Sequence, residues 1–355
     1  MSIQSSALTT KRNFFHRHEK LSLVLVNLLF LTLLLALGEI AARYVTHYEI
    51  GYYTDPPAKN GMHHYPWGDV PINSLGFADQ EFDLSGTKPR AGWFGDSVNA
   101  GLGAGYPYRM SDLVRAQFPK MDNWNLGGHF GSEFEGPDWE NAAQQLHLGT
   151  VVYVLNLNDI TPALQSESAS GQAVYRLAAF TRTYLDALRD KSYLYNYLRT
   201  SIKNAMQRIG FEASGYYAYE LWPNQADDVF KYFAGRVNET FHRLRDKGVQ
   251  MCVLISPYEM QISSDAARTY ANLGFKWEDG FLDGSAQKRV RQYLDKDLPV
   301  YDGLNAFRDR NGKVGEYFVY NLGDKVDWNH PNRQGHALLA EGFAKSGSCP
   351  TYKGN

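Results

Sequence analysis

The sequence has only two cysteines among 355 residues, Cys252 and Cys349. Two cysteines do not form the dense disulfide framework of a small secreted domain, so a hydrophobic core has to hold the fold together. One bridge between them is open in an oxidising compartment. Because Cys252 stands in an apolar run typical of a buried strand, we expect it to be an unpaired core residue.

The sequence also lacks an excess of either charge, with a formal net charge of −2 and 21% charged residues. This balance argues against nucleic acid as a partner. We find no internal repeat and no Gly-x-Gly-x-x-Gly after a strand, which argues against a dinucleotide. Asp327, His330 and His336 come nearest to a metal-ligand set, but no further Asp, Glu or Cys stands at ligand spacing beside them. We therefore expect neither a metal nor a cofactor.

One long apolar run is present, Leu21 to Leu37, interrupted only by Ser22, Asn27 and Thr32. With residues 38–45 the helical stretch is about 25 residues long, or about 37 Å, enough to cross a bilayer. The apolar run predicts a transmembrane anchor over 21–45, and basic residues in the tail 1–20 predict a cytoplasmic amino terminus with the remainder on the far side of the membrane. A cleaved signal peptide is the alternative, but the apolar run is longer than that class has.

Residues 46–89 are rich in Tyr, Pro, Gly and Asn and have no sustained periodicity. We interpret them as a stalk. The isolated apolar residues within 71–77 need a place of burial, so we expect the stalk to pack on the domain that follows.

From Arg90 onward, short apolar runs alternate with helical patterns. The predicted strands are 91–94, 123–126, 150–157, 249–255 and 299–301, and the predicted helices are 106–118, 135–146, 172–209, 227–247, 285–294 and 333–345. This alternation predicts an α/β fold for 90–355, in which helices cover both faces of a parallel sheet of about five strands in three layers. Residues 161–248 are too long for one crossover and predict a helical insertion that walls the site or faces the membrane.

Chemically useful residues follow the predicted strands, where parallel sheets bind ligands. They are Ser97 in Phe94-Gly95-Asp96-Ser97, Gly127 in Asn125-Leu126-Gly127, Asn158 in Asn156-Leu157-Asn158-Asp159, and the late pair Asp327 and His330. Taken singly, each has a plain explanation as a turn, a helix cap or a packed histidine. Together they predict a hydrolytic site.

In this interpretation His330 takes the proton of Ser97, and Asp327 fixes the imidazole tautomer. The backbone N–H groups of Ser97 and Gly127 and the side-chain amide of Asn158 would bind the oxyanion that forms when Ser97 attacks an ester.

The four blocks, in this order, resemble those of the SGNH (GDSL-type) hydrolase superfamily over residues 90–345. The resemblance implies a flavodoxin-like fold, Ser97 as nucleophile, Asp327 and His330 as the rest of a catalytic triad, and Gly127 and Asn158 as oxyanion donors. Asn156 departs from the pattern, because the third block usually has glycine there, and we expect its larger side chain to narrow the pocket or alter the approach to Asn158.

An amino-terminal helix that ends in Gly-Glu-Ile-Ala-Ala-Arg (38–43), followed by Asn-Ser-Leu-Gly-Phe (73–77), resembles membrane-anchored members that bacteria encode among surface-polysaccharide functions. The resemblance implies an anchor in the inner membrane and a periplasmic or extracellular domain. The resemblance implies a serine esterase or O-acyltransferase that acts on O-acetyl or other small acyl esters of cell-surface glycans through an acyl-serine intermediate. Lipid esters are an alternative substrate. The rival function is a non-catalytic binding or assembly subunit whose helix pairs with a membrane acyltransferase through Asn27 and Thr32.

Overall fold

The computed structural model describes residues 18–45, 61–65, 68–127, 136–160, 188, 191–208, 227–272, 282–308, 310, 312–319, 321–322 and 325–353. Most of the predicted tail 1–20, part of the predicted stalk 46–89 and much of the predicted insertion 161–248 lie outside these residues.

Five parallel strands form the central sheet, each within one residue of its predicted ends. They are β3 (Arg90–Gly95), β4 (Asp122–Asn125), β5 (Thr150–Asn156), β6 (Gln250–Ser256) and β7 (Val300–Asp302), in the spatial order β4-β3-β5-β6-β7. Numbered from the first of the five, this is the flavodoxin-like order 2-1-3-4-5, whose switch point lies between the first and third strands. Here those strands are β3 and β5, so the switch point lies beside the turn that carries Ser97.

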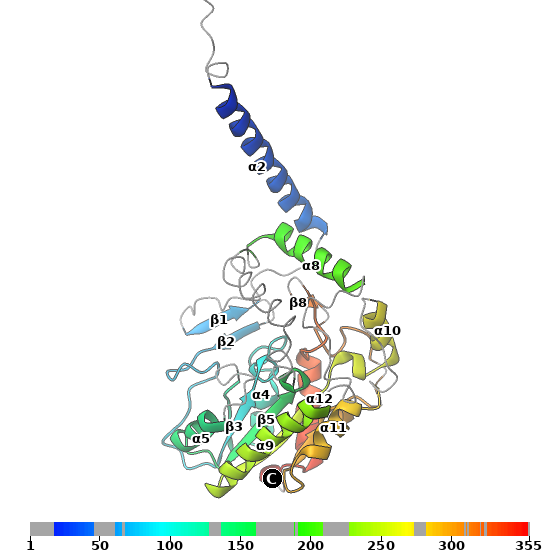
Figure 1. Ribbon diagram of the computed structural model, residues 1–355. Helices are drawn as coiled ribbons and strands as arrows, with labels where there is room; N and C mark the ends of the chain where they lie inside the picture. Colours follow the sequence, from blue (N-terminus) through cyan, green and yellow to red (C-terminus); the bar gives the residue numbers. More distant parts are fainter. Residues whose placement is uncertain are drawn as a thin grey trace, which may run out of the picture.

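Helices cover both faces of the sheet (Figure 1). Along β5, Val151 and Tyr153 point into a core shared with α5 (Gly136–Gln145), α9 (Asp227–Asp246) and α11 (Ser285–Tyr293). The alternate residues Val152 and Val154 point into a second core, shared with α4 (Met110–Gln117) and α12 (Arg333–Ser346). This alternation in strands buried on both faces confirms the predicted three-layer α/β/α architecture.

Several smaller elements surround the sheet. Two are antiparallel hairpins, β1 (Met62–Tyr65) with β2 (Gly68–Pro71) and β8 (Asn321–Leu322) with β9 (Lys325–Val326). Three are α-helices, α3 (Ser97–Ala100), α8 (Tyr193–Arg208) and α10 (Ser264–Asn272). The others are short 3₁₀ turns at Leu157–Ile160, Glu259–Gln261, Gly303–Ala306 and Pro350–Tyr352. The sequence patterns do not predict the hairpins or α10. Helix α4 begins at Met110, four residues after its predicted start.

The amino-terminal helix α2 (Glu19–Val45) projects from the domain (Figure 1). Its 27 residues span about 40 Å at 1.5 Å per residue, and only 6% of its most apolar window is buried. By length and composition α2 can cross a membrane, and its exposure distinguishes it from the core helix of a soluble protein.

The end of α2 is bound to α8. The Glu39 carboxylate accepts hydrogen bonds from the Ser192 hydroxyl at 2.8 Å and from the backbone N–H groups of Tyr193 and Leu194 at 3.0 Å each. A Cβ on Gly38 would lie 3.0 Å from Leu194 Cδ2, so the two helices approach closely there. Glu39 therefore satisfies N–H groups that the first turn of a helix leaves without partners.

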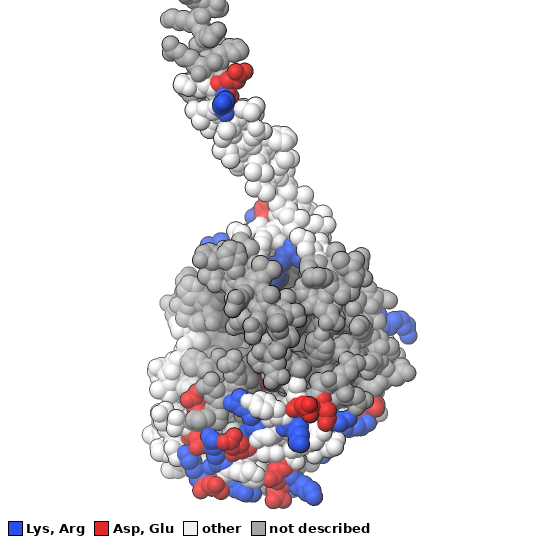
Figure 2. All heavy atoms as spheres, in the orientation of Figure 1, with Lys and Arg blue, Asp and Glu red and all other residues white. Residues whose placement is uncertain are grey.

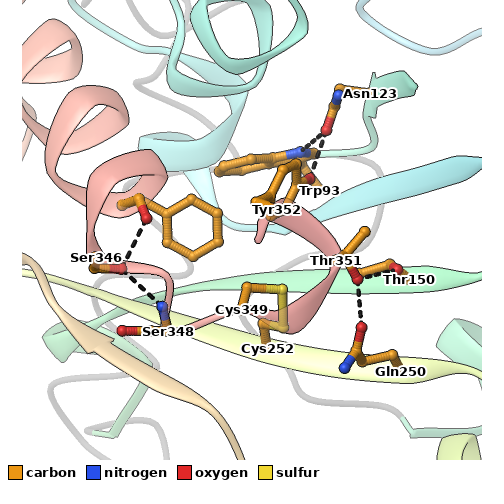
Figure 3. Close-up of a disulfide and its surroundings, with 11 residues drawn as sticks. Trp93, Asn123, Thr150, Gln250, Cys252, Ser346, Ser348, Cys349, Thr351 and Tyr352 are labelled. Carbon is orange, nitrogen blue, oxygen red and sulfur yellow. Dashed lines mark hydrogen bonds between the residues drawn. A yellow bond between two sulfur atoms is a disulfide. The ribbon is translucent and has the colours of Figure 1, made fainter. Parts of the chain in front are cut away.

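The prediction that Cys252 is unpaired is wrong, because Cys252 of β6 forms a disulfide with Cys349 (Figure 3). After α12 the chain returns across the sheet, where the Tyr352 hydroxyl donates to Asn123 Oδ1 at 2.5 Å. The two cysteines are 97 residues apart in sequence. Local patterns do not show this return of the chain, so they did not reveal the pairing.

Candidate active site

Ser97 is the first residue of α3, directly after β3. Gly95 has φ 151°, and a Cβ there would lie 2.7 Å from the carbonyl oxygen of Val154, so the turn requires glycine. The Asp96 carboxylate accepts the Val98 N–H at 2.8 Å and caps α3. The tight turn leaves Ser97 half-buried at the carboxyl edge of the sheet.

The structure brings Ser97, His330 and Asp327 together, although 233 residues separate the first two. Ser97 Oγ lies 2.7 Å from His330 Nε2, and His330 Nδ1 lies 2.6 Å from Asp327 Oδ2. Asp327 Oδ1 accepts the backbone N–H groups of Asn329 at 2.7 Å and His330 at 3.0 Å. These bonds fold residues 327–330 into a turn that aims the carboxylate at the imidazole.

This arrangement can activate a hydroxyl. With its proton on Nδ1 toward Asp327, the His330 ring presents a bare Nε2 to Ser97 Oγ. Asp327 and His330 are buried, which strengthens their electrostatic contact, whereas Ser97 remains half-exposed.

The predicted oxyanion donors lie at the ends of the neighbouring strands. The Ser97 N–H has no partner among the hydrogen bonds of the described residues, and half-buried Asn158 stands in the 3₁₀ turn after β5. The Gly127 N–H donates to Asn125 Oδ1 at 2.9 Å. A Cβ on Gly127 would lie 2.5 Å from the backbone nitrogen of Ala100, so only glycine fits this close to α3.

Asn156, which replaces the glycine of the resembled pattern, is fully buried. Its side-chain amide donates to Asp96 Oδ2 at 2.9 Å, and its backbone N–H donates to Asp159 Oδ2 at 3.1 Å. The amide thus ties the end of β5 to the residue before Ser97.

Two buried residues that sequence patterns did not single out lie behind Asp327. The Tyr270 hydroxyl is 2.8 Å from the Asp327 carbonyl oxygen and also hydrogen-bonds Glu259 Oε2. Burial raises the pKa of Glu259, and the nearby Asp327 charge raises it further. The Tyr270 hydroxyl thus links the buried Glu259 carboxyl to the backbone of Asp327. Only spatial proximity reveals this group, since Glu259 is 68 residues away from Asp327 in sequence.

A buried ion-pair network supports the other side of the site, where the sequence again gave no signal. Arg109 is fully buried and pairs with Asp79 at 3.1 Å and Asp112 at 2.7 Å. Asp79 also accepts the Asn125 N–H at 2.7 Å, and the Asn125 side chain donates to the Asn99 carbonyl oxygen at 2.7 Å. The segment before β3 thereby holds the loops after β3 and β4 in register.

His336, on α12, is buried and accepts the Met110 N–H through Nδ1 at 3.2 Å. Burial, with smaller contributions from Arg109 and His330, lowers its pKa from 6.5 to about 3. It is therefore a neutral structural histidine. Among the described residues there is no group of three His, Cys, Asp or Glu that would hold a metal ion.

The depressed pKa of His336 predicts acid sensitivity. The unfolded chain binds a proton below about pH 6.5 while the folded chain does not, so stability is complete above that pH and is lost as pH falls toward 3. At about 1.4 kcal/mol per pKa unit, the loss in free energy of unfolding from this residue is about 3 kcal/mol at pH 4. Urea unfolding at pH 7 and pH 4 measures it, with His336→Gln expected to abolish this part of the loss and exposed His147→Asn to leave it intact. Equal losses in all three proteins would refute the assignment.

In sequence, the chain matches no protein-family model and no curated protein. Among solved structures it is similar to a lipolytic protein of the G-D-S-L family from Desulfitobacterium hafniense (11% identity, TM-score 0.34, covering 73% of this chain and 99% of that one). It is also similar to an acetylxylan esterase from Geobacillus stearothermophilus (12% identity, TM-score 0.38, covering 73% of this chain and 94% of that one). A third similar structure is an α/β hydrolase from the Lake Arreo metagenome (16% identity, TM-score 0.35, covering 74% of this chain and 95% of that one).

Proposed function

We propose that this chain is an SGNH-type serine esterase or O-acyltransferase that works through an acyl-Ser97 intermediate outside the cytoplasmic membrane. The observation that carries the proposal is the hydrogen-bonded series Ser97, His330 and Asp327, with contacts of 2.7 and 2.6 Å. A binding or assembly subunit has no need of such a series, so catalysis is favoured over the scaffold role.

The chemistry follows from the contacts. Ser97 Oγ forms a bond to the ester carbonyl carbon while His330 Nε2 takes its proton, and Asp327 stabilises the resulting imidazolium. The alcohol then leaves as His330 returns the proton to it, which leaves an acyl group on Ser97. Water or a sugar hydroxyl, deprotonated by His330, attacks the acyl group and frees Ser97.

The oxyanion formed in each attack needs preorganised donors. We assign the Ser97 N–H and the Asn158 side-chain amide to this role. The Gly127 N–H contributes as a shared donor, because it already bonds Asn125 Oδ1.

Asn158→Ala is expected to lower kcat for p-nitrophenyl acetate about 10²- to 10³-fold with little change in KM, since the amide acts on charge that appears only in the transition state. Steady-state kinetics of the full chain measure this. Asn305→Ala, at an exposed position, is the matched control and should retain wild-type values. An unchanged kcat in Asn158→Ala would remove this residue from the oxyanion site.

Three observations support a location outside the cytoplasm. Helix α2 can cross a membrane, its last turns are bound to α8, and the Cys252–Cys349 disulfide is a bond that forms and persists in oxidising compartments. Glycans under assembly meet an anchored enzyme at the membrane surface, so we propose O-acetyl or other small acyl esters of cell-surface glycans as substrates. The Thr32 hydroxyl donates to the Leu28 carbonyl within α2 and needs no partner helix, which weakens the argument for a membrane acyltransferase partner.

The proposal is tested with the full chain in nanodiscs, incubated with p-nitrophenyl acetate with or without a glycan oligomer as acceptor. Mass spectrometry should find acetyl on Ser97, and the release of acetate or of acetylated glycan distinguishes hydrolysis from transfer. Absence of both the Ser97 adduct and labelling of Ser97 by a fluorophosphonate would overturn the assignment.

A further inference from the structure

The contact between α2 and α8 fixes the depth of α8 relative to a membrane. The apolar part of α2 ends at Leu37, and Glu39 and Arg43 follow within two turns. Figure 2 shows the shaft of α2 without charge between the charged groups near its two ends. A helix of this pattern spans a bilayer with Leu37 at the edge of the hydrocarbon, so Glu39 lies at headgroup level.

Because Glu39 binds the first N–H groups of α8, the start of α8 lies at the same level. The junction has further support: Arg43 pairs with Glu39 at 3.5 Å and lies over the Tyr193 ring, 5.4 Å from its centroid. The hydroxyl of Ser192, the residue directly before α8, also accepts the Tyr195 N–H at 3.1 Å and so caps the start of the helix. The carboxylate and the hydroxyl together hold α8 on the end of the anchor as a fixed joint.

From this joint α8 crosses the axis of α2 and lies between it and the rest of the domain (Figure 1). Three large apolar side chains stand exposed on α8 at neighbouring helical positions: Tyr197 at 40%, Leu198 at 49% and Ile202 at 59%. Leu198 and Ile202 are four residues apart and therefore share one face of α8, and Tyr197 lies about 100° around the helix from Leu198. Apolar side chains on a surface helix otherwise pack into a core.

We propose that this face of α8 lies in the headgroup layer of the membrane that α2 crosses and holds the domain in one orientation on the lipid surface. The partner is lipid because the joint places α8 at that depth and its residues suit that layer. Tyrosine and aliphatic side chains bury in the headgroup and acyl boundary, and basic residues such as Arg43 and Lys191 reach anionic headgroups. The inference rests on the proposed anchor. It means that α2 holds the domain in a fixed position relative to the membrane and does not act as a flexible linker.

The test uses the full chain, with its native disulfide oxidised, in nanodiscs that contain phosphatidylglycerol and spin-labelled quencher lipids. An environment-sensitive fluorophore is attached in turn to Leu198→Cys on α8, Leu28→Cys within α2 and Tyr232→Cys, an exposed position on α9. We expect blue-shifted emission at position 198 with loss of fluorescence to quenchers near the headgroup, loss at position 28 to deep quenchers, and no loss at position 232.

Each outcome discriminates. Loss of fluorescence to quencher lipids at position 28 but not at position 198 would overturn the surface contact of α8. A blue shift at position 198 that depends on protein concentration, without loss of fluorescence to the quenchers, would mean that a second copy of the chain covers this face. No quenching at 28 would refute the anchor itself. Fluorophosphonate labelling of Ser97 in the same samples reports the proposed catalysis separately.

Glu39→Ala removes the acceptor for three donors and is expected to lower the quenching at position 198 without loss of Ser97 labelling. Glu19→Ala, at the other end of α2, is the matched control. Unchanged quenching in Glu39→Ala would show that Glu39 does not hold α8 at the membrane.

Discussion

Ser97→Ala is expected to reduce kcat for p-nitrophenyl acetate by roughly 10⁴- to 10⁶-fold and to abolish fluorophosphonate labelling, because no acyl-enzyme can form without the hydroxyl. His330→Ala should lose about as much, and the double variant no more than either single one, since the two groups act as a unit. Steady-state kinetics of the full chain and mass spectrometry of the labelled protein provide the measurement. Ser85→Ala, at an exposed serine outside the site, serves as the control.

Asp327→Asn is the most informative variant of this set. The asparagine oxygen can still accept the N–H groups of Asn329 and His330, so the turn is preserved. Its amide then donates to His330 Nδ1, which forces the ring proton onto Nε2 and removes the base from Ser97. We expect a loss of about 10⁴ in kcat with an unchanged thermal midpoint. A variant that retains activity would show that His330 is not the base.

The sequence was informative where the fold depends on local patterns. Each strand of the sheet is a short apolar run, and a strand that is buried on both faces can be recognised from such a run without knowledge of its neighbours. The ends of those runs located Ser97, Gly127 and Asn158, because polar residues and glycine replace apolar ones where each strand ends. Their roles remain a proposal, but the sheet places them together as the strand order requires.

Features that depend on long-range contacts could not be predicted from the sequence. Asp79 and Arg109 form a buried ion pair 30 residues apart, and each resembles an ordinary surface charge in the sequence. Glu259 lies behind Asp327 because β6 and the loop before α12 meet at the same edge of the sheet. A charged residue is almost never expected to be fully buried, so its partner has to be seen before its place is known.

Reduction of the Cys252–Cys349 disulfide is expected to lower the free energy of unfolding by about 4 kcal/mol, since a bridge that closes a long loop restricts the unfolded chain most. The loop spans 97 residues. The chain has no other cysteine, so a reductant acts on this bond alone. Urea unfolding with and without reductant measures the change, and the Cys252→Ala/Cys349→Ala double variant should match the reduced protein and no longer respond to reductant.

Catalysis should survive this loss. Cys252 is the third residue of β6 and lies toward the amino ends of the strands, whereas Ser97 follows the carboxyl end of β3. The bridge holds residues 349–352 on the sheet, where Thr351 contacts Thr150 at 2.8 Å and Tyr352 contacts Asn123 (Figure 3). None of these residues touches the triad, so at 25 °C the reduced protein should retain wild-type kcat while its urea midpoint falls. Equal losses of kcat and stability would mean that the two ends of the sheet are coupled, and an unchanged midpoint would mean that the carboxyl-terminal segment is held by its hydrogen bonds and packing alone.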